Sequence, residues 1–161
     1  MSLKGKIVFI TGASAGIGAA TAFAFAAEGA RLLLAARRTA KLAEVAAQAF
    51  ERGAPAVHTF ELDVRNYRAV QDAIDALPEP WAPIDILVNN AGLSRGLDKL
   101  YAGNVEDWDE MIDTNVKGVL YVSRAVVPGM VARGSGHIVN MGSTAGEITY
   151  PSGAEIGRAH V

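Results

Sequence analysis

A glycine-rich stretch near the N-terminus places the strongest constraint on what this chain can fold into. It reads Thr11-Gly12-Ala13-Ser14-Ala15-Gly16-Ile17-Gly18 and lies between an apolar run at residues 6–10 and an alanine-rich segment at residues 19–28. The apolar run predicts a strand and the alanine-rich segment predicts a helix. A helix that starts after such a turn offers free backbone N–H groups to an anion. The stretch therefore indicates nucleotide binding, with a plain turn between strand and helix as the alternative.

The three glycines of this stretch have separate predicted tasks. Gly12 lets the chain turn off the strand, Gly16 leaves room for a pyrophosphate, and Gly18 lets the helix pack close to the sheet. The phosphate loop of ATP-binding proteins is excluded, because no Gly-Lys-Ser or Gly-Lys-Thr sequence follows. The residues of this stretch that are predicted to bind the nucleotide are Gly12, Ala13, Ser14, Ala15, Gly16, Ile17 and Gly18.

The composition of the whole chain narrows the classes of partner. Its 161 residues are 50% hydrophobic and 20% charged, as in one globular domain, and the formal net charge is −2. This charge gives no basis for binding nucleic acid or an anionic membrane. The chain has no cysteine, and its three histidines lack metal-ligand spacing, so neither a disulfide nor a metal site is predicted. We expect a cytoplasmic protein, because no segment has the pattern of a signal peptide or a membrane span.

Strand-like and helix-like segments alternate along the rest of the chain. Further strands are predicted at residues 31–36, 56–62, 84–88 and 137–141, and further helices at residues 39–52, 66–77 and 105 to about 130. Asn66 and Asn104 are predicted to cap two of these helices. Such alternation predicts an α/β fold with a parallel sheet and helices on both faces. Right-handed crossovers then give a Rossmann-type doubly wound sheet with strand order 3-2-1-4-5.

Polar residues follow several of the predicted strands. Asp63-Val64 follows the third strand, Asn89-Asn90-Ala91-Gly92 follows the fourth, and Gly142-Ser143 follows the fifth. Because the carboxyl ends of parallel strands meet at one edge of a sheet, we expect these residues to form one site with the glycine-rich stretch. Two alternatives remain open: the tetrapeptide forms only a turn, or Asp63 caps the next helix.

In combination, these motifs resemble the short-chain dehydrogenase/reductase family. The glycine-rich stretch matches the family's Thr-Gly-x-x-x-Gly-x-Gly pattern, and Asp63-Val64, the Asn-Asn-Ala-Gly tetrapeptide, Asn115 and Ser143 match its other signatures. Residues 105–146 look like the branch that holds NADP-dependent 3-hydroxy acid dehydrogenases, including serine and allo-threonine dehydrogenases. The resemblance implies an oxidoreductase that transfers hydride between a nicotinamide cofactor and a hydroxyl or carbonyl of a small substrate. It also implies a parent protein that is a homodimer or homotetramer.

The resemblance assigns roles to individual residues. It implies that Asp63 and Val64 flank the adenine, and that Asn90, Ala91 and Gly92 line the cofactor ribose. Two residues are assigned to catalysis. Ser143 would donate a hydrogen bond to the substrate oxygen, and Asn115 would support a water chain to a catalytic lysine. An asparagine that satisfies the backbone of a kinked helix is the alternative for Asn115.

Two arginines after the second predicted strand indicate which dinucleotide is bound. NAD-specific sites place a carboxylate near the end of this strand to hold the ribose 2′-hydroxyl. Here that position is Ala36, followed by Arg37 and Arg38. Guanidinium groups match the oxygens of a 2′-phosphate, so we expect NADP(H) in preference to NAD(H). The alternative is that the arginines only cap the start of a helix.

The sequence departs from the family pattern after the fifth predicted strand. The resemblance implies a catalytic tyrosine and a lysine one helical turn later, and the matching positions hold Ile156 and His160. Isoleucine cannot transfer a proton, and histidine has no permanent charge at neutral pH. Tyr150 is interpreted as a loop aromatic near the substrate rather than a replacement base. The chain as written is therefore expected to be inactive, and a non-catalytic NADP(H)-binding module is the alternative function.

The match to the family ends at Ala154. Residues 155–161 read Glu-Ile-Gly-Arg-Ala-His-Val and back-translate into a string similar to a sequencing-library adapter. We therefore expect residues 1–154 to form an incomplete NAD(P)-binding Rossmann domain that lacks the family's C-terminal strands and helices. Residues 155–161 are expected to be a non-native tail, with a natural truncation as the alternative.

Overall fold

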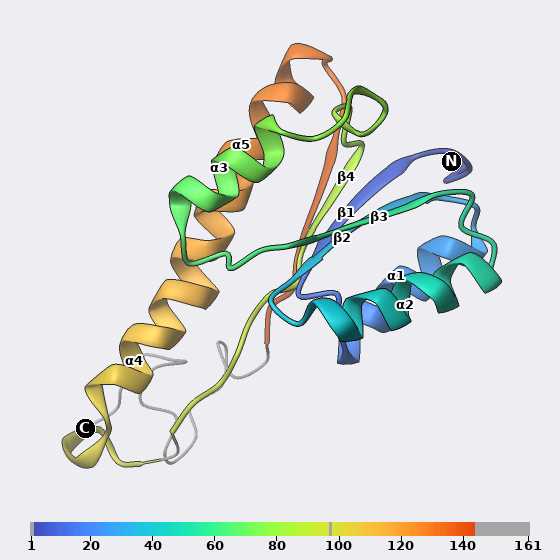
Figure 1. Cartoon of the computed structure of the whole chain (residues 1–161). Coiled ribbons are helices and arrows are strands. Elements are labelled where there is room, and N and C mark those ends of the chain that lie inside the picture. The colour runs from blue at the N-terminus through green and yellow to red at the C-terminus, as the bar shows by residue number, and fades with distance from the viewer. Residues whose placement is uncertain (1, 97, 144–161) are drawn as a thin grey trace.

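A five-stranded parallel sheet organises the part of the chain that the computed structural model describes, residues 2–96 and 98–143 (Figure 1). Its order is β3-β2-β1-β4-β5, as the sequence predicts. The strands are β1 (Ile7–Thr11), β2 (Arg31–Ala36), β3 (Val57–Glu61), β4 (Ile86–Asn89) and β5 (His137–Asn140). Each connection between parallel neighbours crosses over through a helix, which brings the carboxyl ends of all strands to one edge.

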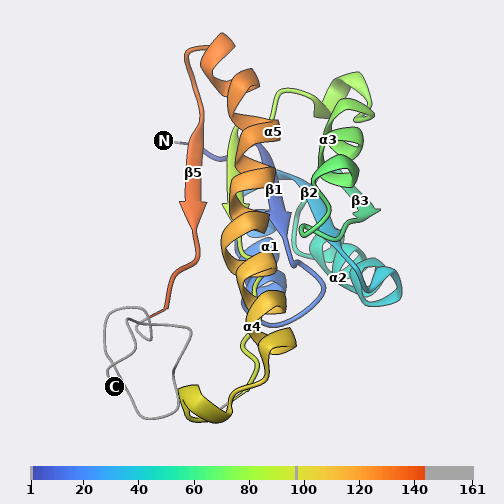
Figure 2. The same cartoon turned by 90° about the vertical axis from the view of Figure 1, so that its left-hand side faces the viewer.

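Helices cover both faces of the sheet. The α-helices are α1 (Gly16–Ala27), α2 (Thr39–Glu51), α3 (Tyr67–Asp75), α4 (Val105–Ile112) and α5 (Gly118–Ala132). Short 3₁₀ turns occupy Glu79–Trp81 and Leu100–Ala102, and a π-helical turn, η3, occupies Asp113–Lys117. Helices α1 and α2 lie on one face, and α3 and α5 lie on the other (Figures 1 and 2). Within the described residues, none of these helices has the length and apolar character that crossing a lipid bilayer requires.

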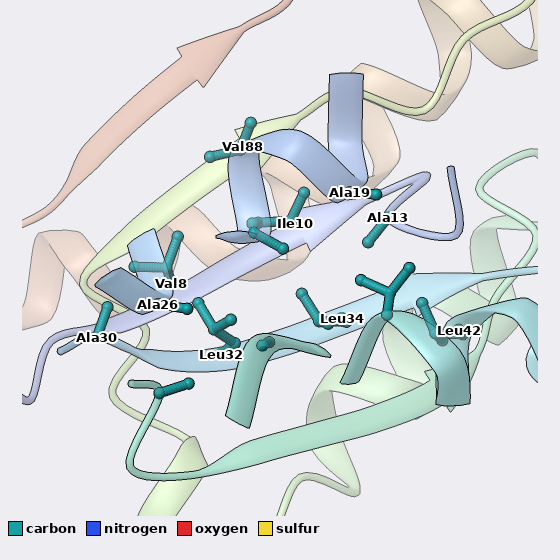
Figure 3. Packing of buried hydrophobic residues seen from close by; sticks show 14 of the residues in the cluster. Val8, Ile10, Ala13, Ala19, Ala26, Ala30, Leu32, Leu34, Leu42 and Val88 are labelled. Carbon is teal, nitrogen blue, oxygen red and sulfur yellow. The ribbon is translucent and has the colours of Figure 1, made fainter. Parts of the chain in front are cut away.

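Alternate residues of the central strands supply two separate cores. Val8 and Ile10 of β1 pack with Leu32 and Leu34 of β2 toward α1 and α2 (Figure 3). Their neighbours Ile7 and Phe9 point to the opposite face, toward α3 and α5. All five residues of β1 are buried, which is why this strand reads as a continuous apolar run rather than an alternating one. The glycine-rich turn is therefore anchored at the end of a fully buried strand.

The observed boundaries differ from the predicted ones in ways that matter for the site. Helix α1 begins at Gly16 rather than at residue 19, so two of the three glycines belong to its first turn. Strand β4 extends to Asn89, so the first asparagine of the Asn-Asn-Ala-Gly tetrapeptide is part of the sheet. The predicted long helix is continuous through α4, η3 and α5, and it contains a π-helical turn that the sequence did not predict. Periodicity alone does not reveal one inserted residue in a helical turn.

The predicted helix caps are confirmed. The side chain of Asn66 accepts a hydrogen bond from the Ala69 N–H at the start of α3, and that of Asn104 accepts one from the Glu106 N–H at the start of α4. The residues proposed to depart from the family pattern, Tyr150, Ile156 and His160, lie outside the described residues. The predicted tail at residues 155–161 lies outside them as well.

Candidate functional site

A cavity of about 500 Å³ lies at the carboxyl ends of β1, β2, β3 and β4. The structure brings most of the sequence-predicted nucleotide-binding residues together around it. From that predicted set, the lining contains Gly12, Ser14, Ala15, Gly16, Ile17, Gly18, Arg37, Arg38, Asp63, Val64, Asn90, Ala91 and Gly92. Four further lining residues were not predicted as ligand contacts: Ala36, Leu62, Leu93 and Thr114.

Ala13 is the member of the predicted set that does not line the cavity. Its side chain is fully buried in the core between the sheet and α1, as Figure 3 shows. Its backbone N–H donates to the Ala35 carbonyl at 3.2 Å. Ala13 therefore joins the glycine-rich turn to β2, and the small side chain suits this packing position.

The glycine-rich turn has the geometry that its residues predict. Gly12 has a φ of +65°, and a Cβ there would lie 2.8 Å from the Cα of Ala91. A Cβ on Gly18 would lie 2.5 Å from both the Asn90 side-chain nitrogen and the Gly12 carbonyl oxygen. The absence of a side chain at Gly18 therefore leaves room for Asn90, which follows β4, and lets α1 pack close to the sheet. Gly16 has a φ of +54° with nothing within 4 Å of an added Cβ, so the space above it is open.

The N-terminus of α1 is open to an anion. The residue before the helix, Ala15, supplies no side-chain cap, and the first turn contains no acidic side chain. The first N–H groups of a helix lack partners within the helix, and the helix dipole favours negative charge there. The combination of an uncapped helix N-terminus with the open space over Gly16 fits a pyrophosphate group.

Thr11 and Asn90 lock the glycine-rich turn to the chain that follows β4. The Thr11 Oγ1 accepts hydrogen bonds from the N–H groups of Asn90 at 3.1 Å and Ala91 at 3.0 Å. It also donates to the Val88 carbonyl at 3.4 Å. In return, the Asn90 side-chain NH₂ donates to the Thr11 carbonyl at 2.9 Å and the Gly12 carbonyl at 3.3 Å. Sequence reasoning missed this role of Thr11, although a buried threonine at a strand end is a signal for it.

The two predicted phosphate-binding arginines have different surroundings. The Arg38 guanidinium donates to the Ser14 Oγ through Nε at 3.3 Å and Nη2 at 3.1 Å. Arg38 precedes α2 but makes no side-chain capping bond to it, so the capping alternative is wrong for this residue. The Arg37 side chain is 54% exposed and lies 3.9 Å from a carboxylate oxygen of Glu110. Both arginines line the cavity.

Asp63 is held by Arg65 rather than by the start of α3. The Asp63 carboxylate accepts hydrogen bonds from the Arg65 backbone N–H at 3.0 Å and from Nη2 at 2.6 Å. The capping alternative for Asp63 is wrong, because Asn66 caps α3. The hydrogen bonds from Arg65 hold the pKa of the Asp63 carboxyl below its ordinary value, against the opposing effect of burial. Asp63 therefore presents a fixed, ionised carboxylate at the cavity wall.

A second cavity of about 450 Å³ adjoins the first. The two share Ile17, Asn90, Gly92 and Leu93, and both predicted catalytic residues, Asn115 and Ser143, line the second one. The rest of its lining is largely apolar and comes from Met111, Ile112, Val116 and Met141, with Gly142. An anion-binding cavity beside a largely apolar one fits a dinucleotide with a small substrate at its end.

The Asn115 side chain bonds the loop after β4 rather than its own helix. Its Oδ1 accepts from the Leu93 N–H at 2.9 Å, and its Nδ2 donates to the Leu93 carbonyl at 2.8 Å. The alternative in which Asn115 bonds the backbone of its own helix is therefore wrong, because its partner is Leu93. The helix does depart from α-helical geometry at this position. Functional sites are frequent locations of such π-helical turns.

Two further polar residues, Thr114 and Asn89, lie near the site. Thr114 is buried beside Asn115, and its Oγ1 has no partner among the described residues. Asn89 donates through Nδ2 to Ser123 at 3.0 Å and to Asn140 at 2.8 Å, which ties β4 to α5 and β5. Among the described residues, no group of three or more histidine, aspartate or glutamate side chains is placed to hold a metal ion.

Comparison with known proteins identifies the family. The sequence pattern described as short chain dehydrogenase matches residues 6–155. The chain belongs to this family. A relative named NADP-dependent 3-hydroxy acid dehydrogenase YdfG, from Salmonella typhi, is 46% identical over 147 residues, which are 91% of this chain and 58% of that protein. Sulfoacetaldehyde reductase 2 from Chromohalobacter salexigens is 46% identical over 146 residues, which are 90% of this chain and 57% of that protein.

Solved structures of the family superpose well on this chain. The closed form of a serine dehydrogenase complexed with NADP⁺ matches with a TM-score of 0.87 and 44% identity. That match covers 92% of this chain and 58% of the other. The chain therefore spans less than two thirds of the length of these relatives. The described residues contain the part that carries the strand-end cavities.

Proposed function

We propose that this chain binds NADP(H), and that the protein it represents is an NADP-dependent oxidoreductase. Hydride would pass between NADP(H) and a hydroxyl or carbonyl of a small substrate such as a 3-hydroxy acid. The observation that carries the proposal is the placement of an uncapped helix N-terminus and two guanidinium groups around one cavity. Ala36 stands where an NAD-specific site has a carboxylate, so the 2′-position of the ribose would meet positive rather than negative charge.

Different residues of the chain would bind different parts of the cofactor. The N–H groups at the start of α1 would bind the pyrophosphate, and Arg37 and Arg38 would bind the 2′-phosphate. Asp63 and Val64 would flank the adenine, and the chain from Asn90 to Gly92 would line the ribose. The bound nicotinamide would supply or accept the hydride. Ser143 would donate a hydrogen bond to the substrate oxygen, while Asn115 would fix the loop that separates the two cavities.

Two relatives bear on the substrate. The 3-hydroxy acid dehydrogenase and the sulfoacetaldehyde reductase are equally similar to this chain, at 46% identity each. The names of these two relatives indicate different small substrates, a 3-hydroxy acid and sulfoacetaldehyde. We propose a small alcohol or carbonyl compound, with a 3-hydroxy acid as the first substrate to assay, and a parent protein that is a homodimer or homotetramer.

Titration of the full chain with NADPH and NADH tests the cofactor proposal. We expect NADPH to bind more tightly, because a 2′-phosphate gains charge-assisted hydrogen bonds from two guanidinium groups. The double charge reversal Arg37→Asp with Arg38→Asp should weaken NADPH binding by at least about tenfold more than NADH binding. Lys41→Asp with Arg68→Asp changes the same charge at exposed positions and should not alter the ratio. Equal weakening of both cofactors by the Arg37 and Arg38 pair would contradict the proposal.

A non-catalytic NADP(H)-binding module is the second candidate function. It is favoured by Ile156 and His160, which stand where the family resemblance implies the catalytic tyrosine and lysine. A chain with these residues is expected to bind NADPH without oxidising it. An assay of NADPH absorbance with the purified chain and a panel of small carbonyl compounds separates the two functions, because turnover would exclude the binding module.

A further inference from the structure

Glu110 of α4 faces three arginines from three different loops. Its Oε1 accepts a hydrogen bond from Arg65 at 3.1 Å, and its Oε2 accepts one from Arg95 at 2.9 Å. The Arg37 Nη1 lies 3.9 Å from the same Oε1 that Arg65 uses. These arginines follow β2, β3 and β4, so one carboxylate connects the ends of three strands. We refer to Glu110, Arg37, Arg65 and Arg95 as the Glu110 cluster.

The three ion pairs of Glu110 are not equal. Arg65 and Arg95 are hydrogen-bonded to separate oxygens, whereas the distance to Arg37 is too long for a hydrogen bond. The Glu110 side chain is only 21% exposed, which limits the screening of its charge by water. Arg37 is therefore attracted toward Glu110 without being fixed to it, and its guanidinium remains at the border of the cavity.

Glu110 does not line the cavity itself. It forms ion pairs with Arg37, which lines the cavity, and with Arg65, whose other partner Asp63 lines it. Removal of the Glu110 charge would leave the Asp63–Arg65 pair in place, because that pair is local and has its own hydrogen bonds. Among the arginines of the cluster, only Arg37 lines the cavity, so the effect of such a change on the cavity should come mainly through Arg37.

We infer that Glu110 is a specificity-determining residue that competes with the 2′-phosphate of NADP(H) for Arg37. The inference rests on the proposed binding of NADP(H). A guanidinium group binds both carboxylates and phosphates. Any interaction that Arg37 keeps with the Glu110 carboxylate therefore weakens its interaction with the 2′-phosphate. Glu110 attracts Arg37 and thereby lowers the affinity of the site for the 2′-phosphate. NADH lacks that phosphate, so its affinity is unaffected by the competition.

The variant Glu110→Gln removes the charge, keeps the size of the side chain and keeps one of its two accepting oxygens. In isothermal titrations of the full chain, NADPH affinity is expected to rise by roughly 3- to 10-fold, the effect of removing one nearby like charge from a screened dianion. NADH affinity is expected to change less than about twofold. Asp109→Asn is the matched control, because it removes the same charge from the preceding residue of α4, an exposed position, and should leave the ratio of the two affinities unchanged.

A double variant shows whether Glu110 acts through Arg37. In an Arg37→Gln background, Glu110→Gln is expected to give no gain in NADPH affinity. Arg95→Gln is a second test that does not depend on the stability of the Glu110 variant, because the Arg95 side chain is 54% exposed. It should weaken NADPH binding selectively, since Glu110 would then be more available to Arg37.

The possible results separate this inference from the proposed function. If the unaltered chain binds neither dinucleotide, the proposed function is wrong and the inference is wrong with it. If the unaltered chain prefers NADPH but Glu110→Gln weakens NADPH binding, or changes both cofactors equally, only the inference is overturned. A gain in NADPH affinity that persists without Arg37 would also overturn it.

Discussion

At the residue scale, Thr11 connects two strands of the sheet through a single hydroxyl group. One hydroxyl accepts two backbone N–H groups, from Asn90 and Ala91, and donates to the Val88 carbonyl. Thr11 is 1% exposed, so water cannot replace these partners. The residue thereby fixes the end of β1 to the end of β4, the two strands that flank the predicted pyrophosphate position.

The variant Thr11→Val tests this role, because it keeps the shape of the side chain and removes the hydroxyl. We expect the free energy of unfolding to fall by about 1–3 kcal/mol, the cost of leaving buried polar groups unpaired. Urea denaturation of the full chain measures the change. Thr11→Ser retains the hydroxyl and should lose less stability than Thr11→Val. A Val variant as stable as the original would show that these hydrogen bonds contribute nothing net.

Gly18 is a second residue with a sharp expectation. A methyl group there would meet the Asn90 side chain and the Gly12 carbonyl at 2.5 Å each, and the backbone partner cannot move freely. Gly18→Ala should therefore destabilise the chain and weaken the binding of NADPH and NADH alike, because the turn serves the pyrophosphate that both contain. Ala20→Ser, at an exposed position of the same helix, is the control. Unchanged binding of both cofactors by Gly18→Ala would contradict this reading of the turn.

At the scale of elements, the connection from β3 to α3 carries a pH-dependent contribution to stability. Hydrogen bonds from Arg65 lower the pKa of Asp63 in the folded chain. A carboxyl with a depressed pKa in the folded state binds fewer protons there than when unfolded. Its stabilising effect is complete above its ordinary pKa, near 3.9, and is lost as the pH falls below that value toward the folded-state pKa.

The pH dependence is measured by urea denaturation between about pH 2 and pH 6. The unaltered chain should lose stability on acidification more steeply than Asp63→Asn, whose side chain does not titrate. Asp75→Asn, on the exposed surface of α3, controls for loss of a carboxylate elsewhere. Parallel stability curves for the unaltered chain and Asp63→Asn would show that the pair with Arg65 does not shift the titration of Asp63.

The elements themselves were largely predictable because each has a local cause. Apolar runs gave the strands, and the polar caps Asn66 and Asn104 gave two helix starts that the structure confirms. The π-helical turn at Asp113–Lys117 was not predictable, because one inserted residue leaves the segment helical and apolar periodicity does not reveal it. Asn115, whose side chain bonds Leu93, lies within this turn.

At the scale of the whole molecule, the strand order could be predicted from the alternation of strands and helices and from the right-handed crossovers between parallel strands. The same reasoning predicted which edge of the sheet carries the site. The structure confirms the order β3-β2-β1-β4-β5, and it places the residues at the ends of β1 to β4 around one cavity and Ser143 at the adjoining cavity. Contacts between residues distant in sequence were not predictable. Arg65 and Glu110 are 45 residues apart in the sequence, and no local pattern indicates that the fold brings them within 3.1 Å of each other. Ala13 was assigned to the ligand for the same reason, since the turn alone does not show which side chain enters the core.

The central claim is that NADP(H) occupies the cavity at the carboxyl ends of β1 to β4. The most direct measurement is the change in backbone amide NMR shifts of the full chain on addition of NADP⁺, compared with NAD⁺. We expect large changes at residues 12–18 and near Asp63 and Asn90 with both cofactors, and additional changes at Arg37 and Arg38 with NADP⁺ alone. Shifts confined to other surfaces, or an identical response to the two cofactors at Arg37 and Arg38, would contradict it.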